Sequence, residues 1–172
     1  MQTRGGKILL YGYGNPGRGD DGLGPALIAE LERLGTESAT LESNYQLSVE
    51  DAAEVAAHPT VIFIDADTAG AGPFRFERVI PERTISFSSH SIAPGAVVAL
   101  AQQLFGKHAD AYLLAIRGYE FDEFNESLSY LARENLGEAL EFVTRALQER
   151  RFDEYLKQYG IDCGCSISAD AQ

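Results

Sequence analysis

Residues 7–24 constrain the fold most, because an apolar run passes there through a glycine-rich loop into a helical pattern. Ile8–Tyr11 form the apolar run, glycines and a proline fill the loop, and Leu23 begins a stripe of leucines at helical spacing. This order predicts a strand, a tight loop and a helix start. A helix start takes one capping carboxylate, whose oxygen accepts from free N–H groups of the first turn. Asp20 and Asp21 stand there together, so we expect one to cap and the other to be available for chemistry.

The rest of the chain alternates strand and helix patterns. Strands are predicted at 39–45, 60–64, 74–80 and 111–116, and helices at 23–34, 48–55, 94–105 and 127–150. The six-residue connection 68–73 is too short for a parallel crossover, which needs a dozen residues or more. We therefore expect 74–80 to return antiparallel, as a hairpin with 60–64, and to form an edge strand.

This order of elements predicts an α/β fold with three layers, α/β/α. The sheet is expected to have five strands, mostly parallel with one antiparallel edge strand, and helices on both faces. Residues 1–150 are predicted to form a single domain, which suits a chain of 172 residues. Residues 151–172, which contain Cys163 and Cys165, lack a clear period and are expected to form a mobile or loosely docked C-terminal tail.

The charge balance excludes two classes of partner. The chain has 14 Lys and Arg against 26 Asp and Glu, a net charge of −12. Nucleic acids and anionic membranes both need a basic face, so we expect neither as a partner. The sequence also has no signal-peptide pattern and no spanning apolar run, and we expect a cytoplasmic, soluble protein without membrane insertion.

Three residues with metal-binding side chains are predicted to meet at one edge of the sheet. Asp21 follows the first strand and Asp65 the third, and the nine residues before His90 can span ~30 Å, enough to bring His90 to the same edge. Two carboxylates and an imidazole leave coordination positions open and suit zinc, nickel or iron better than calcium. The alternative also stays open that the aspartates only cap a helix and end a strand, and that His90 lies in a serine-rich loop.

A rival interpretation starts from Gly12, Gly14 and Gly17, whose spacing matches the Gly-x-Gly-x-x-Gly dinucleotide fingerprint. The motif follows a strand, and Glu42 after the second strand could bind a ribose. Two observations oppose it. The paired aspartates would repel a pyrophosphate at the helix start, and Gly17 falls before the helix, whereas the third glycine of the fingerprint belongs inside it.

Three segments resemble the signatures of the nickel–iron hydrogenase maturation endopeptidases. They are Gly14-Asn-Pro-Gly-Arg-Gly-Asp-Asp-Gly-Leu-Gly24, Ile64-Asp65-Ala66 at a strand end, and Ser89-His90-Ser-Ile. Their order and separations also match, and the likeness runs from about Lys7 to Arg150.

The resemblance implies a peptidase that binds the nickel-loaded precursor of a hydrogenase large subunit and removes a short C-terminal extension. The metal ligands carry over as Asp21, Asp65 and His90. Nickel is expected to come with the substrate, and zinc or cadmium could substitute at the same site. Asn15, Tyr45 and Gln46 are expected to bind substrate, and we expect a monomer.

One segment departs from the family pattern. Many relatives have an Asp-Gly-Gly-Thr-like segment after the second strand, where this chain has Ser43–Leu47. The departure leaves the catalytic group unassigned. If the metal polarises the scissile carbonyl or activates a water, the reaction is Lewis-acid hydrolysis. A non-catalytic nickel-binding maturation chaperone is the second alternative.

Overall fold

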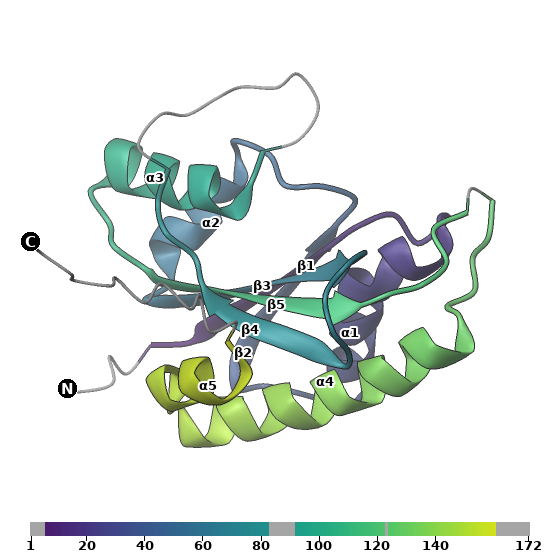
Figure 1. The fold of residues 1–172 in the computed structure, drawn as a ribbon. Helices are drawn as coiled ribbons and strands as arrows, with labels where there is room; N and C mark the ends of the chain where they lie inside the picture. The colour runs from purple at the N-terminus through teal and green to yellow at the C-terminus, as the bar shows by residue number, and fades with distance from the viewer. Residues whose placement is uncertain (1–5, 83–91, 123, 161–172) are drawn as a thin grey trace, which may run out of the picture.

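The computed structural model describes residues 6–82, 92–122 and 124–160, and its five strands form a single sheet (Figure 1). The strands are β1 (Ile8–Tyr13), β2 (Ala39–Asn44), β3 (Thr60–Asp67), β4 (Phe74–Arg78) and β5 (Asp110–Arg117). A short 3-10 helix, η1 (Gly19–Gly22), precedes the helices α1 (Leu23–Arg33), α2 (Asp51–Ala57), α3 (Pro94–Phe105), α4 (Tyr130–Glu149) and α5 (Phe152–Tyr159). Helices α2 and α3 cover one face of the sheet and α1, α4 and α5 the other, which confirms the predicted α/β/α layers.

The strand order is β2-β1-β3-β5-β4, with β4 antiparallel to β5 and every other pair parallel. The predicted antiparallel edge strand is confirmed, but the predicted hairpin of β3 with β4 is wrong, because β5 lies between them. Strand β5 is apolar along most of its length and is buried on both faces, as a central strand requires. The connection from β3 to β4 therefore crosses the width of one strand.

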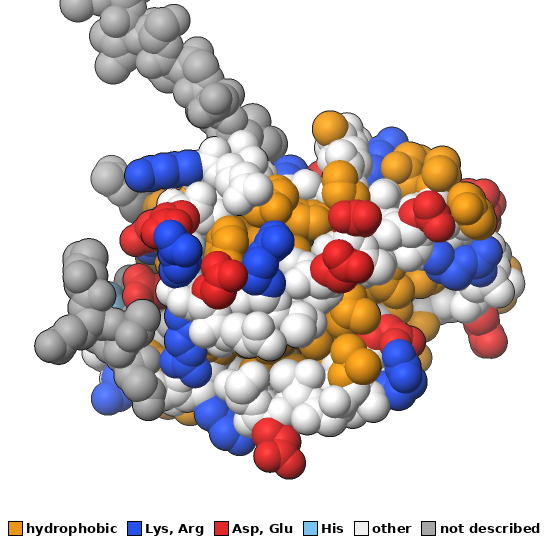
Figure 2. Space-filling model, turned by 90° about the horizontal axis from the view of Figure 1, so that it is seen from below, with side chains coloured by type: hydrophobic (Ala, Val, Ile, Leu, Met, Phe, Trp, Pro, Cys, Tyr) orange, Lys and Arg blue, Asp and Glu red, His pale blue; other side chains and the backbone are white. Residues whose placement is uncertain are grey.

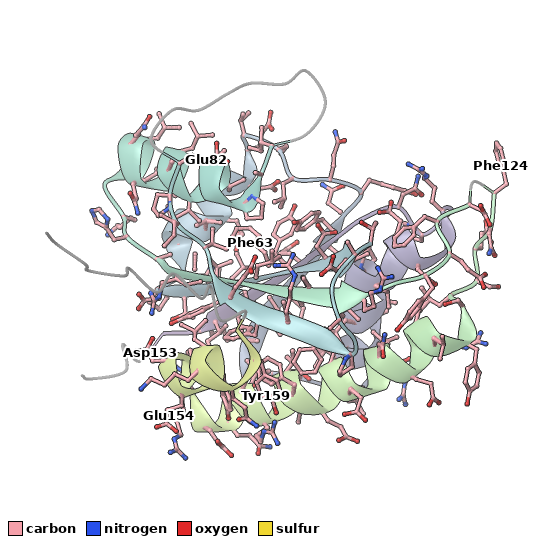
Figure 3. All side chains as sticks on the ribbon, viewed as in Figure 1. Phe63, Glu82, Phe124, Asp153, Glu154 and Tyr159 are labelled. Atoms are coloured by element: carbon pink, nitrogen blue, oxygen red, sulfur yellow. The ribbon has the colours of Figure 1, made fainter. Side chains whose placement is uncertain are left out.

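Strand β3 separates two apolar cores. Ile62 and Ile64 belong to the core under α1 and α4. Val61 and Phe63 belong to the core under α2 and α3, on the side of the sheet where Figure 3 labels Phe63. All four side chains are fully buried. The strand is therefore a continuous apolar run rather than an alternating one, as the sequence indicated.

Residues 152–159 form a packed helix. Phe152 and Tyr155 of α5 are buried, and the Tyr155 ring lies 5.2 Å from the ring of Phe142 in α4. An ion pair of 2.7 Å joins Arg78 of β4 to Asp153 of α5, which Figure 3 labels. Helix α5 therefore contacts both α4 and β4. The expectation of a loosely docked segment is wrong for this helix, while Cys163 and Cys165 lie outside the described residues. No helix within 6–82, 92–122 and 124–160 could cross a membrane.

Two glycines bring the start of α1 against the sheet. A Cβ at Gly24 would lie 2.5 Å from the carbonyl oxygen of Ile64 in β3, and one at Gly12 in β1 would collide with the carbonyl of Gly24. No larger residue fits either position without moving backbone. This close approach places η1, which carries Asp21, beside the carboxyl end of β3, where Asp65 lies.

Candidate functional site

A pocket of about 600 Å³ opens at the carboxyl end of the parallel strands. The sequence rule for α/β sheets predicts a ligand site at this edge. The lining residues come from the ends of β1, β2 and β3, from η1, and from the segments that flank 83–91: Tyr13, Gly14, Asp21, Tyr45, Gln46, Leu47, Asp65, Glu82, Ile92, Ala93 and Pro94.

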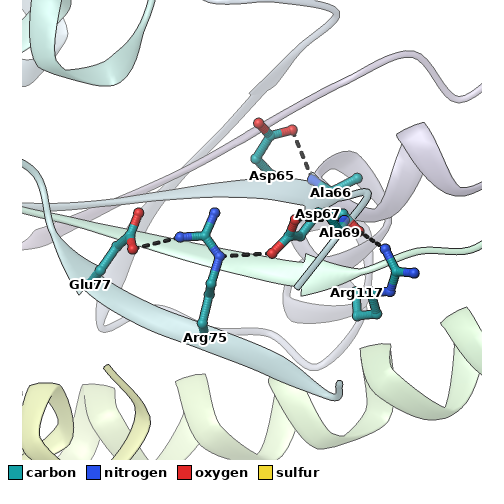
Figure 4. A network of polar contacts seen from close by, with 7 residues as sticks. All are labelled: Asp65, Ala66, Asp67, Ala69, Arg75, Glu77 and Arg117. Carbon is teal, nitrogen blue, oxygen red and sulfur yellow. Dashed lines mark hydrogen bonds and ion pairs between the residues drawn. The ribbon is translucent and has the colours of Figure 1, made fainter. Parts of the chain in front are cut away.

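The structure brings Asp21 and Asp65 to this pocket. The Asp21 carboxylate accepts a hydrogen bond of 2.9 Å from the backbone N–H of Asn15, and one Asp65 oxygen accepts from the N–H of Ala66 at 2.8 Å (Figure 4). His90 lies outside the described residues. Among the residues that the structure describes, no three His, Cys, Asp or Glu side chains gather closely enough to hold a metal ion. Asp21 and Asp65 thus line one pocket, and metal binding by Asp21, Asp65 and His90 stays a prediction.

Burial raises the pKa of Asp65 to about 6. Hydrogen bonding with the Tyr13 hydroxyl and the Ala66 N–H opposes this rise, while the negative charges of Asp21 and Asp67 add to it. Burial, followed by the charge of Asp65, also raises the pKa of Tyr13, so this hydroxyl stays protonated and can donate. At neutral pH the Asp65 carboxylate is thus ionised but poorly solvated, and a cation in the pocket would stabilise it.

Asp67, two residues further along β3, is held in an ion pair instead (Figure 4). Arg75 of β4 donates from Nε to Asp67 at 2.7 Å and from Nη1 to Glu77 at 2.5 Å. Burial acts to raise the pKa of Asp67, but hydrogen bonds from Arg75 and from the backbone hold it below its usual value. Asp65 is therefore the carboxylate of this strand end that stays available for a ligand.

Asp20 has a structural role that its sequence position did not reveal. Its carboxylate is fully buried and accepts from the backbone N–H groups of Tyr119 (2.7 Å), Glu120 (2.9 Å) and Ser129 (2.7 Å), and from the Ser129 hydroxyl (2.7 Å). Ser129 is the N-cap residue of α4. The expectation that Asp20 or Asp21 caps its own helix is wrong, since neither η1 nor α1 has a side-chain cap.

Two of the three expected substrate-binding residues line the pocket. Tyr45 and Gln46 do so, but Asn15 does not. The Asn15 side chain accepts from the N–H of Gly17 at 2.9 Å and shapes the loop that carries Asp21. The sequence did not single out Tyr13 or Glu82. Tyr13 ends β1 and so follows the same rule of strand ends that identified Asp65.

The glycine motif is used for close packing. Gly12 lies within β1, and Gly14, whose φ is +135°, packs against the backbone of Asp21. Gly17 precedes α1 by six residues, and η1 stands between them. The loop therefore folds against its own backbone, whereas the dinucleotide fingerprint needs its third glycine inside the helix.

The fold defines a class: it is the fold of the [NiFe] hydrogenase maturation proteases. No protein-family model matches the chain, and no curated protein matches its sequence. The structural matches nevertheless cover most of the chain.

Three solved structures illustrate the likeness. The protease HycI from Thermococcus kodakarensis matches with a TM-score of 0.66 and 23% identity over 84% of this chain and 95% of its own. The endopeptidase HybD from E. coli gives 0.67 and 20%, over 84% and 94%. The protease HybD from T. kodakarensis gives 0.61 and 18%, over 82% and 99%. At these identities the likeness establishes a shared fold.

Proposed function

We propose that the chain is an endopeptidase that recognises the nickel-loaded precursor of a [NiFe] hydrogenase large subunit and removes its C-terminal extension. One observation carries the proposal: in the fold of the maturation proteases, Asp21 of η1 and Asp65 near the end of β3 line one pocket at the carboxyl end of the parallel strands. The nickel ion belongs to the substrate.

The pocket chemistry suits recognition of a cation that already has other ligands. Two carboxylates, with His90 proposed as the third ligand, leave coordination positions that groups of the precursor can fill. Because Asp65 loses hydration on burial, a nickel ion beside it restores favourable electrostatics that an empty precursor cannot supply. The proposal therefore requires tighter binding of the loaded precursor.

Cleavage is proposed to use water as the nucleophile. A metal-polarised scissile carbonyl needs an activated water and a group that takes up its proton. The group that takes up this proton is unassigned, because Asp65 is proposed as a ligand of the nickel ion.

Incubation with three candidate ligands separates the proposal from its alternatives. The protein is mixed with nickel-loaded precursor, nickel-free precursor and NAD, and the products are measured by intact mass spectrometry and calorimetry. Truncation of the loaded precursor alone supports the proposal. Nickel capture without truncation favours a chaperone, and NAD binding favours a dinucleotide-binding protein.

A matched pair of variants tests the site itself. Asp65→Ala should abolish truncation. Asp110→Ala should process the precursor normally, because Asp110 is exposed and begins β5, at the end of the parallel strands opposite to the pocket. Equal rates of precursor truncation by the two variants would show that Asp65 does not belong to the active site.

A further inference from the structure

Exposed large apolar side chains gather at the edge of the molecule that holds the pocket. Of the ten such side chains among the described residues, six lie on the β2–α2 or β5–α4 connection or in the first turn of α4. Tyr45 and Val49 belong to the first connection. The other four, Tyr119, Phe124, Tyr130 and Leu131, belong to the second connection and the start of α4, and we call them the apolar rim.

Phe124 is the most exposed member of the apolar rim. Its side chain is 95% exposed and projects from the tip of the β5–α4 connection (Figure 3). Its backbone φ is 63°, a left-handed conformation that is rare for a bulky residue. Figure 2, which views the molecule from the side of α4, shows orange side chains among red and blue ones at the end where α4 begins. Together with the other members of the apolar rim, this exposed ring is available for contact with a partner.

Hydrogen bonds hold Tyr119 and Asn125, on either side of residue 123 in the connection that carries the apolar rim. The N–H of Gly19 donates to the carbonyl of Asn125 at 2.6 Å, and the N–H of Asn125 donates to the carbonyl of Gly17 at 3.2 Å. Asn135 of α4 donates to the Tyr119 hydroxyl at 3.1 Å, and the Arg117 guanidinium lies 4.9 Å from the centre of the Tyr119 ring. A surface ordered in this way loses little entropy when it binds.

Adjacent aspartates couple the apolar rim to the pocket. The Asp20 carboxylate accepts from the N–H groups of Tyr119, a member of the apolar rim, and of Glu120, while Asp21 lines the pocket. One short helix, η1, therefore sets the distance between the two surfaces. A protein that places a segment in the pocket is positioned to contact the apolar rim at the same time.

The acidic side chains around the apolar rim indicate what charge a partner surface should have. Residues 117–131 include four acidic side chains and one basic side chain, and the whole chain has a net charge of −12. A second copy of this chain would bring like charges together, whereas a basic surface would be attracted. We propose that the apolar rim docks the folded body of the hydrogenase precursor, through a precursor surface that is apolar and positively charged. This inference rests on the proposed function.

A double variant tests the docking surface. Phe124→Asn removes the ring and keeps a residue that tolerates the left-handed conformation, and Tyr130→Ser removes a second exposed ring. With nickel-loaded precursor, the double variant should raise both KM and Kd by about tenfold, as loss of central aromatic contacts does, and leave kcat unchanged. Leu104→Ser is the matched control, because Leu104 is 66% exposed near the C-terminal end of α3, away from the pocket.

The outcomes separate this inference from the proposed function. If the wild type truncates the precursor and the double variant keeps the KM and Kd of the control, the docking surface is overturned and the protease assignment stands. If the wild type binds without truncation, the protease assignment fails, and the Kd of the double variant still decides the docking surface. If the wild type does not bind, both fail. Increased salt should weaken wild-type binding, and an unchanged Kd would contradict a basic partner surface.

Discussion

The replacement of Asp20 by Asn tests the buried junction that joins the pocket loop to α4. The carboxylate has no exposed surface, and its two oxygens accept four hydrogen bonds. One oxygen accepts from the Ser129 N–H, and the other accepts from Tyr119, Glu120 and the Ser129 hydroxyl. Asn presents one oxygen and one NH₂ group, so at least one of these donors must face another donor.

The expected loss of stability follows from this arrangement. One buried N–H left without an acceptor costs about 1–3 kcal/mol, and the three remaining bonds lose their ionic character, so Asp20→Asn should lower the free energy of unfolding by roughly 3 kcal/mol. Asp21→Asn is the matched control: Asp21 accepts one backbone N–H, from Asn15, and should lose roughly 1 kcal/mol or less. Urea unfolding followed by circular dichroism measures both.

The pH dependence supplies an independent check. Hydrogen bonds from Tyr119, Glu120 and Ser129 outweigh burial and hold the pKa of Asp20 below its ordinary value of 3.8. The stability that this carboxylate contributes is therefore complete above pH 3.8 and is lost as the pH falls through the lower pKa of the folded state. Asp20→Asn should lack this acid-dependent component. Equal stability of the two Asn variants, or an unchanged acid limb, would refute the reasoning.

Three further predictions test other parts of the structure, one of them with a matched control substitution. The pKa of Asp65 is about 6 in the folded state against an ordinary 3.8, so ionisation of Asp65 destabilises the metal-free fold, fully so above pH 6. Asp65→Asn should therefore be more stable than the wild type at pH 8, by at most about 3 kcal/mol. Urea titrations should show this difference fading between pH 6 and 4. Gly24→Ala should lower the free energy of unfolding by about 3 kcal/mol through overpacking. Gly137→Ala on α4, where nothing lies near the added Cβ, is the control and should raise it by roughly 0.5–1 kcal/mol through helix propensity. Equal thermal midpoints of the two variants would contradict the close packing at Gly24. Phe152→Ala should cost about 3 kcal/mol if α5 belongs to the core, and a negligible loss in urea unfolding would contradict that role.

The sequence allowed the layers of the fold and the edge that holds the site to be predicted. Continuous apolar runs such as Val61–Ile64 indicate strands covered on both faces, and strand ends followed by Asp21 and Asp65 indicate a ligand edge. Both signals are local. They need no knowledge of which distant segments pair.

Features that depend on long-range pairing were not predictable. The six residues after Asp67 exclude a parallel crossover, but they do not determine whether β3 or β5 pairs with β4. The partners of Asp20 lie about a hundred positions away, so its sequence neighbours suggested a helix cap instead. Helix α5 spans eight residues, and such a short segment gives little periodic signal.

The central claim is that Asp21 and Asp65 sense the nickel of the substrate. Its most direct test is the ratio of the affinities for nickel-loaded and nickel-free precursor, measured by calorimetry for the wild type, Asp21→Asn and Asp65→Asn. We expect the wild type to prefer the loaded precursor and each variant to lower the ratio toward one. A ratio that is unchanged in both variants would contradict this claim.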